Sequence, residues 1–200
     1  MGMNASDTEY YVLSATVDHQ AREESMLLEN LQWQSKSGSW QTGVKFEDAP
    51  PNPIVLDIVS GYEEDTTLLS YDDSVPMMRD DLIEALHELG VDNIDAYPVA
   101  IRNTVSGEQI RGYSAINVIG LVSAADPAKT EFSPDEPSHM IDADIDSLTI
   151  DRSGARGLLL FRLAECCTAV IVHRHIKEGL EARSSQLPDI RFIHPKDFVG

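Results

Sequence analysis

The chain has 200 residues, 42% of them hydrophobic, which is enough to bury a core of ordinary size. Its 34 acidic and 15 basic side chains leave a formal net charge of -19, so nucleic acid and anionic membrane are poor partners, because both repel a negative surface. Such a surface favours a basic protein partner, and an acidic shell that only keeps the protein soluble is the alternative.

The N-terminus shows no basic region followed by an apolar run, and no stretch has the unbroken apolar length that a membrane span needs. We therefore expect a cytoplasmic protein with no membrane partner. The two cysteines, Cys166 and Cys167, are adjacent. Neighbouring residues of a strand point to opposite faces, so a structural disulfide between them is not expected, and a reducing compartment is the simpler inference.

The first part of the chain is predicted to hold little regular structure. Residues 10–13 read as an opening strand, and the apolar residues of 22–33 have the spacing of a short helix. From residue 34 to 53 the composition shifts to Ser, Gly, Lys, Gln, Asp and Pro, which predicts a long irregular excursion. Residues 53–60 then read as a strand.

The clearest predicted element is a helix over residues 79–90. Its apolar residues fall at helical spacing and form one buried face: Leu82, Ile83, Leu86 and Leu89. Asp80 and Asp81 suit the positive N-terminal end of the helix dipole. Gly90 is placed to end the helix as its C′ residue.

The rest of the chain reads mostly as strands. Pro98 interrupts a strand over residues 93–101 and indicates an edge or a bulge, because proline cannot donate to a ladder. Ser106 and Gly107 centre a turn. The remaining predicted elements are a buried strand over 116–122, a strand with one wet face over 140–151, strands over 157–163 and 168–173, a helix over 173–184 and a last strand over 189–195.

The segment 112–126 is almost free of reactive side chains and is predicted to be scaffold. Its apolar residues would hold the sheet: Ile116, Val118, Ile119 and Val122. Gly120 marks a bulge or a close backbone approach. Asn117 is expected to be a hydrogen-bonded structural residue, because buried polar groups normally have partners.

These elements predict an α+β fold with a mixed or mostly antiparallel sheet and a few packed helices, since strands and helices do not alternate regularly and no repeat is visible. We expect one folded unit. In it, residues 1–75 supply an N-terminal strand and an irregular excursion packed on the main body, and residues 76–200 form the α+β main body.

Motifs for catalysis and metal binding are incomplete. Nothing matches a nucleophile elbow, a phosphate-binding glycine loop or a Rossmann fingerprint. Residues 142–153 resemble the first half of a calcium loop, but Ser147 replaces the turn glycine and Ser153 replaces the bidentate glutamate. We expect a strand there.

A second incomplete set of metal ligands lies further along the chain. His173 and His175, with Cys166 or Cys167, offer zinc ligands without the usual spaced pairs. We expect ordinary polar surface, no catalytic residue, no metal and no cofactor. The alternative function is a small metal-dependent enzyme or regulator that uses His173, His175 and Cys166.

Two stretches of the chain are rich in acids and contain no lysine or arginine, one between Lys45 and Arg79 and one between Lys129 and Arg152. Charge blocks are usually solvated faces. Two such blocks in one small protein can equally form a surface for a basic partner. The predicted partner-binding residues are Glu63, Glu64, Asp65, Asp135, Glu136, Asp142, Asp144 and Asp146.

Four segments in this order and spacing carry a family resemblance: residues 68–101, with "DDLIEALHELG"; 112–126, "GYSAINVIGLVSAAD"; 158–182, with "LFRL" and "VIVHRHIKEGL"; and 189–198, with "IRF". Together they resemble immunity family eleven of bacterial polymorphic toxin systems. The chain departs from that pattern at His173, where the family commonly has a serine, and in an acidic stretch around residues 135–144.

The resemblance implies a cytoplasmic, non-catalytic protein that binds and neutralises a cognate toxin, and so protects the producing cell and its kin. The family supplies no catalytic residues to carry over. We therefore predict that the chain occludes a toxin with a basic surface through its own acidic surface. A structural accessory protein of a secretion apparatus is a third reading.

Overall fold

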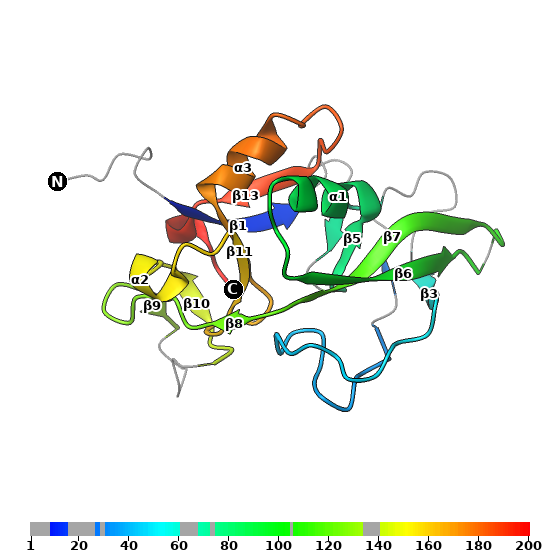
Figure 1. Ribbon diagram of the computed structural model, residues 1–200, viewed down its shortest axis with the longest axis horizontal. Coiled ribbons are helices and arrows are strands. Elements are labelled where there is room, and N and C mark those ends of the chain that lie inside the picture. Colours follow the sequence, from blue (N-terminus) through cyan, green and yellow to red (C-terminus); the bar gives the residue numbers. More distant parts are fainter. Residues whose placement is uncertain are drawn as a thin grey trace.

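The computed structural model describes residues 9–15, 27–28, 31–60, 68–72, 75–104, 106–133 and 141–200. Within these ranges the chain forms two large mixed sheets, one small two-stranded sheet and a few short helices (Figure 1). This agrees with the predicted α+β class. No helix of the described part is long and apolar enough to cross a membrane.

The first sheet has five strands in the order β13-β1-β12-β11-β8. Its strands are β1 (Tyr10–Ala15), β8 (Leu121–Val122), β11 (Leu160–Leu163), β12 (Val170–His173) and β13 (Ile190–Ile193). Neighbours are antiparallel except β8, which pairs in parallel with β11. The N-terminal strand thus lies between two strands from the C-terminal part of the chain.

The second sheet has six strands in the order β2-β3-β6-β7-β5-β4. Its strands are β2 (Leu27–Leu28), β3 (Ile54–Ser60), β4 (Tyr71–Asp72), β5 (Met77–Arg79), β6 (Ile94–Arg102) and β7 (Gln109–Val118). Only β3 and β6 run in parallel. The small sheet pairs β9 (Glu131–Phe132) with β10 (Ile145–Ser147).

The helices are α1 (Asp80–Glu88), α2 (Arg152–Ala155), α3 (Arg174–Glu181) and the 3-10 turn η3 (Pro195–Asp197). In α1 the predicted face is confirmed, because Leu82, Ile83 and Leu86 are buried. The helix ends as predicted at Gly90, whose φ is +95°. The Gly90 N–H donates to His87 O and the Val91 N–H to Leu86 O, which is the Schellman arrangement.

Three apolar clusters fill the spaces between these layers. One joins α1 and α3 to a face of each large sheet, from Leu13 in β1 to Ile190 in β13. A second lies on the other face of the five-stranded sheet, beneath α2 and β10. The third lies between the six-stranded sheet and residues 31–53, which loop below β6 in Figure 1. These residues comprise the excursion predicted over 34–53 and the three residues before it, and they are called the excursion from here on.

The excursion has no helix or paired strand, as predicted, but it is anchored by aromatic residues. Trp40 and Phe46 are buried, and their ring centroids lie 4.9 Å apart in an edge-to-face contact. Trp33 contacts both rings, and Tyr97 of β6 contacts Trp40 and Phe46. Such contacts stabilise a packed arrangement beyond the area they bury. The excursion is therefore a lid on the six-stranded sheet.

The predicted buried strand over 116–122 is divided between the two sheets. β7 ends at Val118 in the six-stranded sheet, and β8 begins at Leu121 in the five-stranded one. Gly120 has a φ of +108° and donates its N–H to Gly43 O at 2.9 Å. A Cβ on Gly43 would lie 2.6 Å from Leu121 N. The close backbone approach predicted at Gly120 is confirmed, and the backbone that Gly120 approaches is that of Gly43.

Two predicted elements are wrong in part. Leu27–Leu28 form strand β2 against β3 and not a helix; the rest of the predicted helix before them lies outside the described residues. In the described part of the segment 140–151, which begins at residue 141, only Ile145–Ser147 is a strand. The chain bends at Asp142, whose φ is +52°, so the side chain of Ile141 is 63% exposed instead of sharing the buried face.

Pro98 lies in an interior strand of its sheet, not in an edge strand. The edge strand predicted from Pro98 is therefore wrong, but the bulge predicted as its alternative is present between Val99 and Ile101. β3 pairs with β6 only from Val99 onward. Pro98 therefore precedes the β3 ladder, where its missing N–H removes no bond to β3.

Candidate partner-binding surfaces

The predicted partner-binding acids fall into two groups. Five of them lie outside the described residues: Glu63, Glu64, Asp65, Asp135 and Glu136. The structure places the other three, Asp142, Asp144 and Asp146, at the entry to β10 and within it. All three are exposed, but they do not have the same surroundings.

Asp142 is built into the fold. Its carboxylate accepts a hydrogen bond from the backbone N–H of Cys167 at 3.2 Å, and its own N–H donates to Ala164 O at 3.0 Å. The N–H of the next residue, Ala143, donates to Glu165 O at 2.6 Å. These bonds hold residues 142–143 against the loop between β11 and β12. Asp142 therefore has a structural role in addition to any contact with a partner.

Asp144 and Asp146 point away from the core. Beside and between them, Ala143 and Ile145 are buried. This alternation follows the period of two that the sequence indicates. The two carboxylates lie on an exposed rim of the small sheet, where a partner can approach them.

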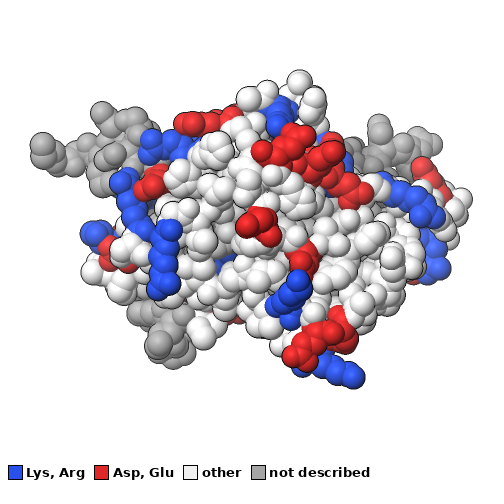
Figure 2. Space-filling view, in the orientation of Figure 1, with Lys and Arg blue, Asp and Glu red and all other residues white. Residues whose placement is uncertain are grey.

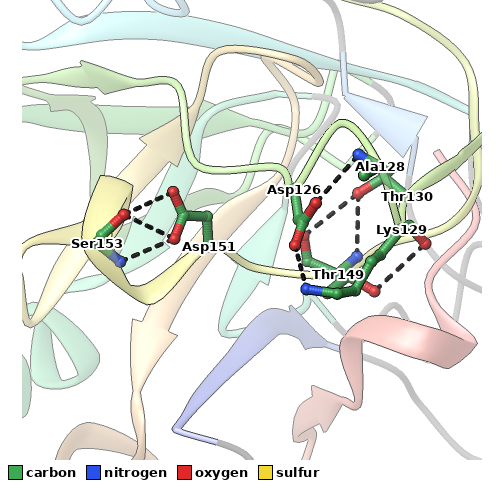
Figure 3. Close-up of polar contacts among 7 residues, drawn as sticks. All are labelled: Asp126, Ala128, Lys129, Thr130, Thr149, Asp151 and Ser153. Carbon is green, nitrogen blue, oxygen red and sulfur yellow. Dashed lines mark hydrogen bonds and ion pairs between the residues drawn. The ribbon is translucent and has the colours of Figure 1, made fainter.

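Asp126, just before the second acidic block, and Asp151, within that block, both hold local structure (Figure 3). The Asp126 carboxylate accepts a hydrogen bond from the N–H of Ala128 and forms an ion pair with Lys129 Nζ at 2.5 Å. Asp151 caps α2 by accepting from the N–H and the hydroxyl of Ser153. The Lys129 ion pair lowers the pKa of Asp126, and the Ser153 hydroxyl lowers the pKa of Asp151. Both carboxylates thus stabilise local turns and a helix start through hydrogen bonds within a few residues.

The first acidic block shows the same use of carboxylates. A hydrogen bond from the Ser35 hydroxyl lowers the pKa of Asp48. The guanidinium of Arg102, 2.6 Å from the carboxylate of Asp57, lowers the pKa of that group. Asp48 fixes the excursion, and Asp57 joins β3 to β6. The acidic blocks are thus not uniform solvated faces.

An acidic face that the sequence reasoning missed lies on α1. Figure 2 shows acidic side chains gathered over this helix. Asp81, Glu84 and Glu88 are exposed and follow one another at intervals of three and four residues, so they share a face. The spacing of these three acids is visible in the sequence, but the sequence analysis considers only Asp80 and Asp81, for their effect on the helix dipole.

This α1 face forms one wall of a groove of about 340 Å³. Ala85 and Leu187 contribute apolar surface to it, and Arg183 and Gln186, from the turns after α3, line the other side. Asp81 pairs with Arg79 at 2.6 Å, and Glu88 pairs with Arg183 at 2.7 Å. Glu84 has no ion-pair partner in the described part of the chain. The groove can receive an aliphatic stem that ends in a positive charge.

The residues of the alternative metal site are not brought together. His173 caps α3, because its Nδ1 accepts from the N–H of His175 at 3.1 Å, and its Nε2 lies 3.2 Å from Glu9 Oε1. His175 is exposed on the helix, and Cys166 lies in the loop before β12. Among the residues described, no group of three or more His, Cys, Asp or Glu side chains is arranged to hold a metal ion.

Strand β11 and the loop that follows it bury two opposite charges. Arg162 is 1% exposed and donates from Nη1 to Cys167 O at 2.5 Å. Glu165 is 4% exposed and accepts from the Ser123 hydroxyl and from Ala124 N. Both cysteines are free thiols. Burial, and then the Asp142 carboxylate, raise the pKa of Cys167, which disfavours the reactive thiolate.

No known protein family matches the chain, and no curated protein is significantly similar to it.

Proposed function

We propose that the chain is an immunity protein that binds a cognate bacterial toxin and occludes its active or substrate-binding surface. The order and spacing of its segments, which resemble immunity family eleven, support this proposal. The structural observation that carries it is the α1 groove, which Asp81, Glu84 and Glu88 line on one side. A positively charged side chain of a protein partner fits that combination.

The mechanism has an approach step and a docking step. The net charge of -19 steers a basic toxin toward the chain, and salt screens this attraction. On docking, a lysine or arginine of the toxin enters the α1 groove and places its charge beside Glu84. The exposed carboxylates Asp144 and Asp146 provide a second acidic surface. A toxin held in this way loses access to its substrate.

Two charge reversals of equal size test the proposal. Glu84→Lys changes the groove, whereas Glu178→Lys changes an exposed position on α3 that does not line it. The partner to be tested is the product of the gene immediately upstream, because a toxin encoded there is what the proposal expects. We expect Glu84→Lys to weaken binding of that protein by about tenfold or more, equivalent to about 1.4 kcal/mol. Glu178→Lys should have a much smaller effect.

Cell survival and association kinetics provide the readouts. Wild-type protein should protect cells that express the toxin, and the association rate should fall as ionic strength rises. Binding with equal affinity by both variants would move the contact away from α1. If the upstream protein is harmless, or does not bind wild-type chain at all, the immunity function itself is wrong.

A further inference from the structure

A second groove, of about 330 Å³, lies where three connecting segments converge. These segments are the turn between α1 and β6, the crossing from β7 to β8, and the turn between α2 and β11. The volume is at the lower end of the range for small-molecule sites, about 300–1,000 Å³. The groove therefore suits a side chain of a protein partner better than a large ligand.

The accessible surface of this groove, called the Leu158 groove from here on, is mostly apolar. Four residues that are not buried provide it: Ile119, Val122, Leu158 and Leu159. Leu158 is 39% exposed. Within the described part of the chain, no lysine, arginine or histidine lines the groove. An aliphatic side chain that enters it removes apolar surface from water on more than one side, which is favourable.

Asn93 adds a fixed polar group to the lining. Its Nδ2 donates to Ile119 O at 2.9 Å and to Leu160 O at 3.1 Å, which sets the orientation of the amide. The described residues donate no hydrogen bond to its Oδ1, and this oxygen is not sealed from solvent as Asn117 Oδ1 is. A peptide carries both features that fit, a main-chain N–H for Asn93 Oδ1 and an apolar side chain for the groove.

The charge at the groove selects the kind of peptide. Asp92 is exposed, lines the groove and forms no ion pair with the described residues. Glu88 lines the α1 groove and is two positions before Gly90, which lines the Leu158 groove. The two grooves thus contact α1 and its C-terminal turn within one helical turn of each other. A segment with a lysine or arginine next to an aliphatic residue complements this combination.

We propose that the Leu158 groove is the apolar anchor site for the cognate toxin, and that it receives an aliphatic side chain next to a lysine or arginine of that protein. This inference rests on the immunity function proposed above. Opposite charges mainly speed encounter, whereas anchors buried in pockets supply most of the binding energy and slow dissociation. The Leu158 groove should therefore govern the dissociation rate, and the acids of α1 the association rate.

Two variants that each add one negative charge test the proposal. Leu158→Glu places the charge in the groove. Val55→Glu is the matched control, because Val55 is an aliphatic residue of β3 that is 51% exposed and lines neither groove. Surface plasmon resonance measures both rate constants for binding to the product of the gene immediately upstream. Leu158→Glu should raise the dissociation rate constant about tenfold or more and leave the association rate constant within about twofold of wild type.

Val55→Glu should change both rate constants by less than about twofold, because the added charge lies outside the contact. A third variant, Leu158→Ala, removes the apolar contact without adding a charge and should also raise the dissociation rate constant. Since Leu158 is partly exposed, all three variants should fold, and thermal denaturation checks this.

The outcomes separate this inference from the immunity function. If wild type binds the upstream product and neither Leu158 variant dissociates faster, the anchor site is wrong and the immunity function stands. If wild type does not bind that product, both proposals fail. Sedimentation velocity of the chain alone checks another occupant: a wild-type dimer that Leu158→Glu separates would assign the groove to a second copy of the chain and overturn the proposal as stated.

Discussion

Ser70 donates its backbone N–H and its hydroxyl to the two carboxylate oxygens of Asp189, at 2.5 and 2.7 Å. The two residues are 119 positions apart in sequence. Ser70 is fully buried and directly precedes β4, whereas Asp189 directly precedes β13. This pair therefore joins the edge strand of one sheet to the edge strand of the other.

Asp189→Ala should destabilise the fold by about 1–3 kcal/mol, because it leaves two buried donors of Ser70 without an acceptor. Urea denaturation at neutral pH measures the change. Asp197→Ala, at an exposed position in η3, is the matched control and should change the free energy of unfolding by less than about 0.5 kcal/mol. Equal effects at both positions would contradict the role of the pair.

His173 should be replaceable by serine but not by alanine. Both substitutions lose the contacts of the ring with Glu9 and Tyr10, and only serine keeps an acceptor for the first turn of α3. The serine variant should therefore be more stable than the alanine variant by about 0.5–2 kcal/mol. Thermal denaturation of the two variants decides this. A cap role also explains how histidine can stand where the resembled family has serine.

Asp142 and Asp146 should respond differently to the same change of charge. Asp142→Lys loses the acceptor for the Cys167 N–H and should cost about 0.5–1.5 kcal/mol of stability. Asp146→Lys should leave stability within about 0.5 kcal/mol of wild type. Denaturant midpoints of the two variants test this. Similar midpoints would mean that the bond from Cys167 contributes nothing.

The decrease in the free energy of unfolding at low pH should depend in part on Asp151. Its pKa is lowered in the folded state, first by the Ser153 hydroxyl and then by the Ser153 N–H. A lowered folded pKa contributes stability above the unfolded value, about 3.9, and that contribution is lost as pH falls through the folded pKa. Asp151→Asn keeps a good N-cap but cannot titrate.

Urea midpoints between about pH 5 and pH 2 should therefore converge for wild type and Asp151→Asn, with the wild-type advantage disappearing at the acid end. A difference that stays constant over this range would show that the carboxylate does not favour the folded state through its charge.

Local patterns in the sequence were enough to predict α1. The spacing of Leu82, Ile83 and Leu86 sets the buried face, and Gly90 ends the helix. Most strands were also found, because their apolar residues have a period of two or form short unbroken runs. These features depend on residues within one or two turns of each other.

The arrangement of the excursion could not be predicted in the same way. Trp33, Trp40 and Phe46 follow no period. The placement of Trp40 and Phe46 depends on contacts with Tyr97, in a strand that comes much later in the sequence. The α1 groove has the same limitation, because its second wall, near Arg183, lies far from the helix in sequence. The acidic face was visible from spacing, but the concavity beside it was not.

Because one continuous segment runs from β7 into β8, the amide hydrogen exchange of the two sheets should be coupled. Val118 and Leu121 belong to different sheets but are separated only by Ile119 and Gly120. Opening either sheet completely would displace backbone amides that the other sheet needs. We therefore expect the slowest-exchanging amides of β7 and β12 to exchange through the same global opening, with equal free energies, instead of through separate openings of each sheet.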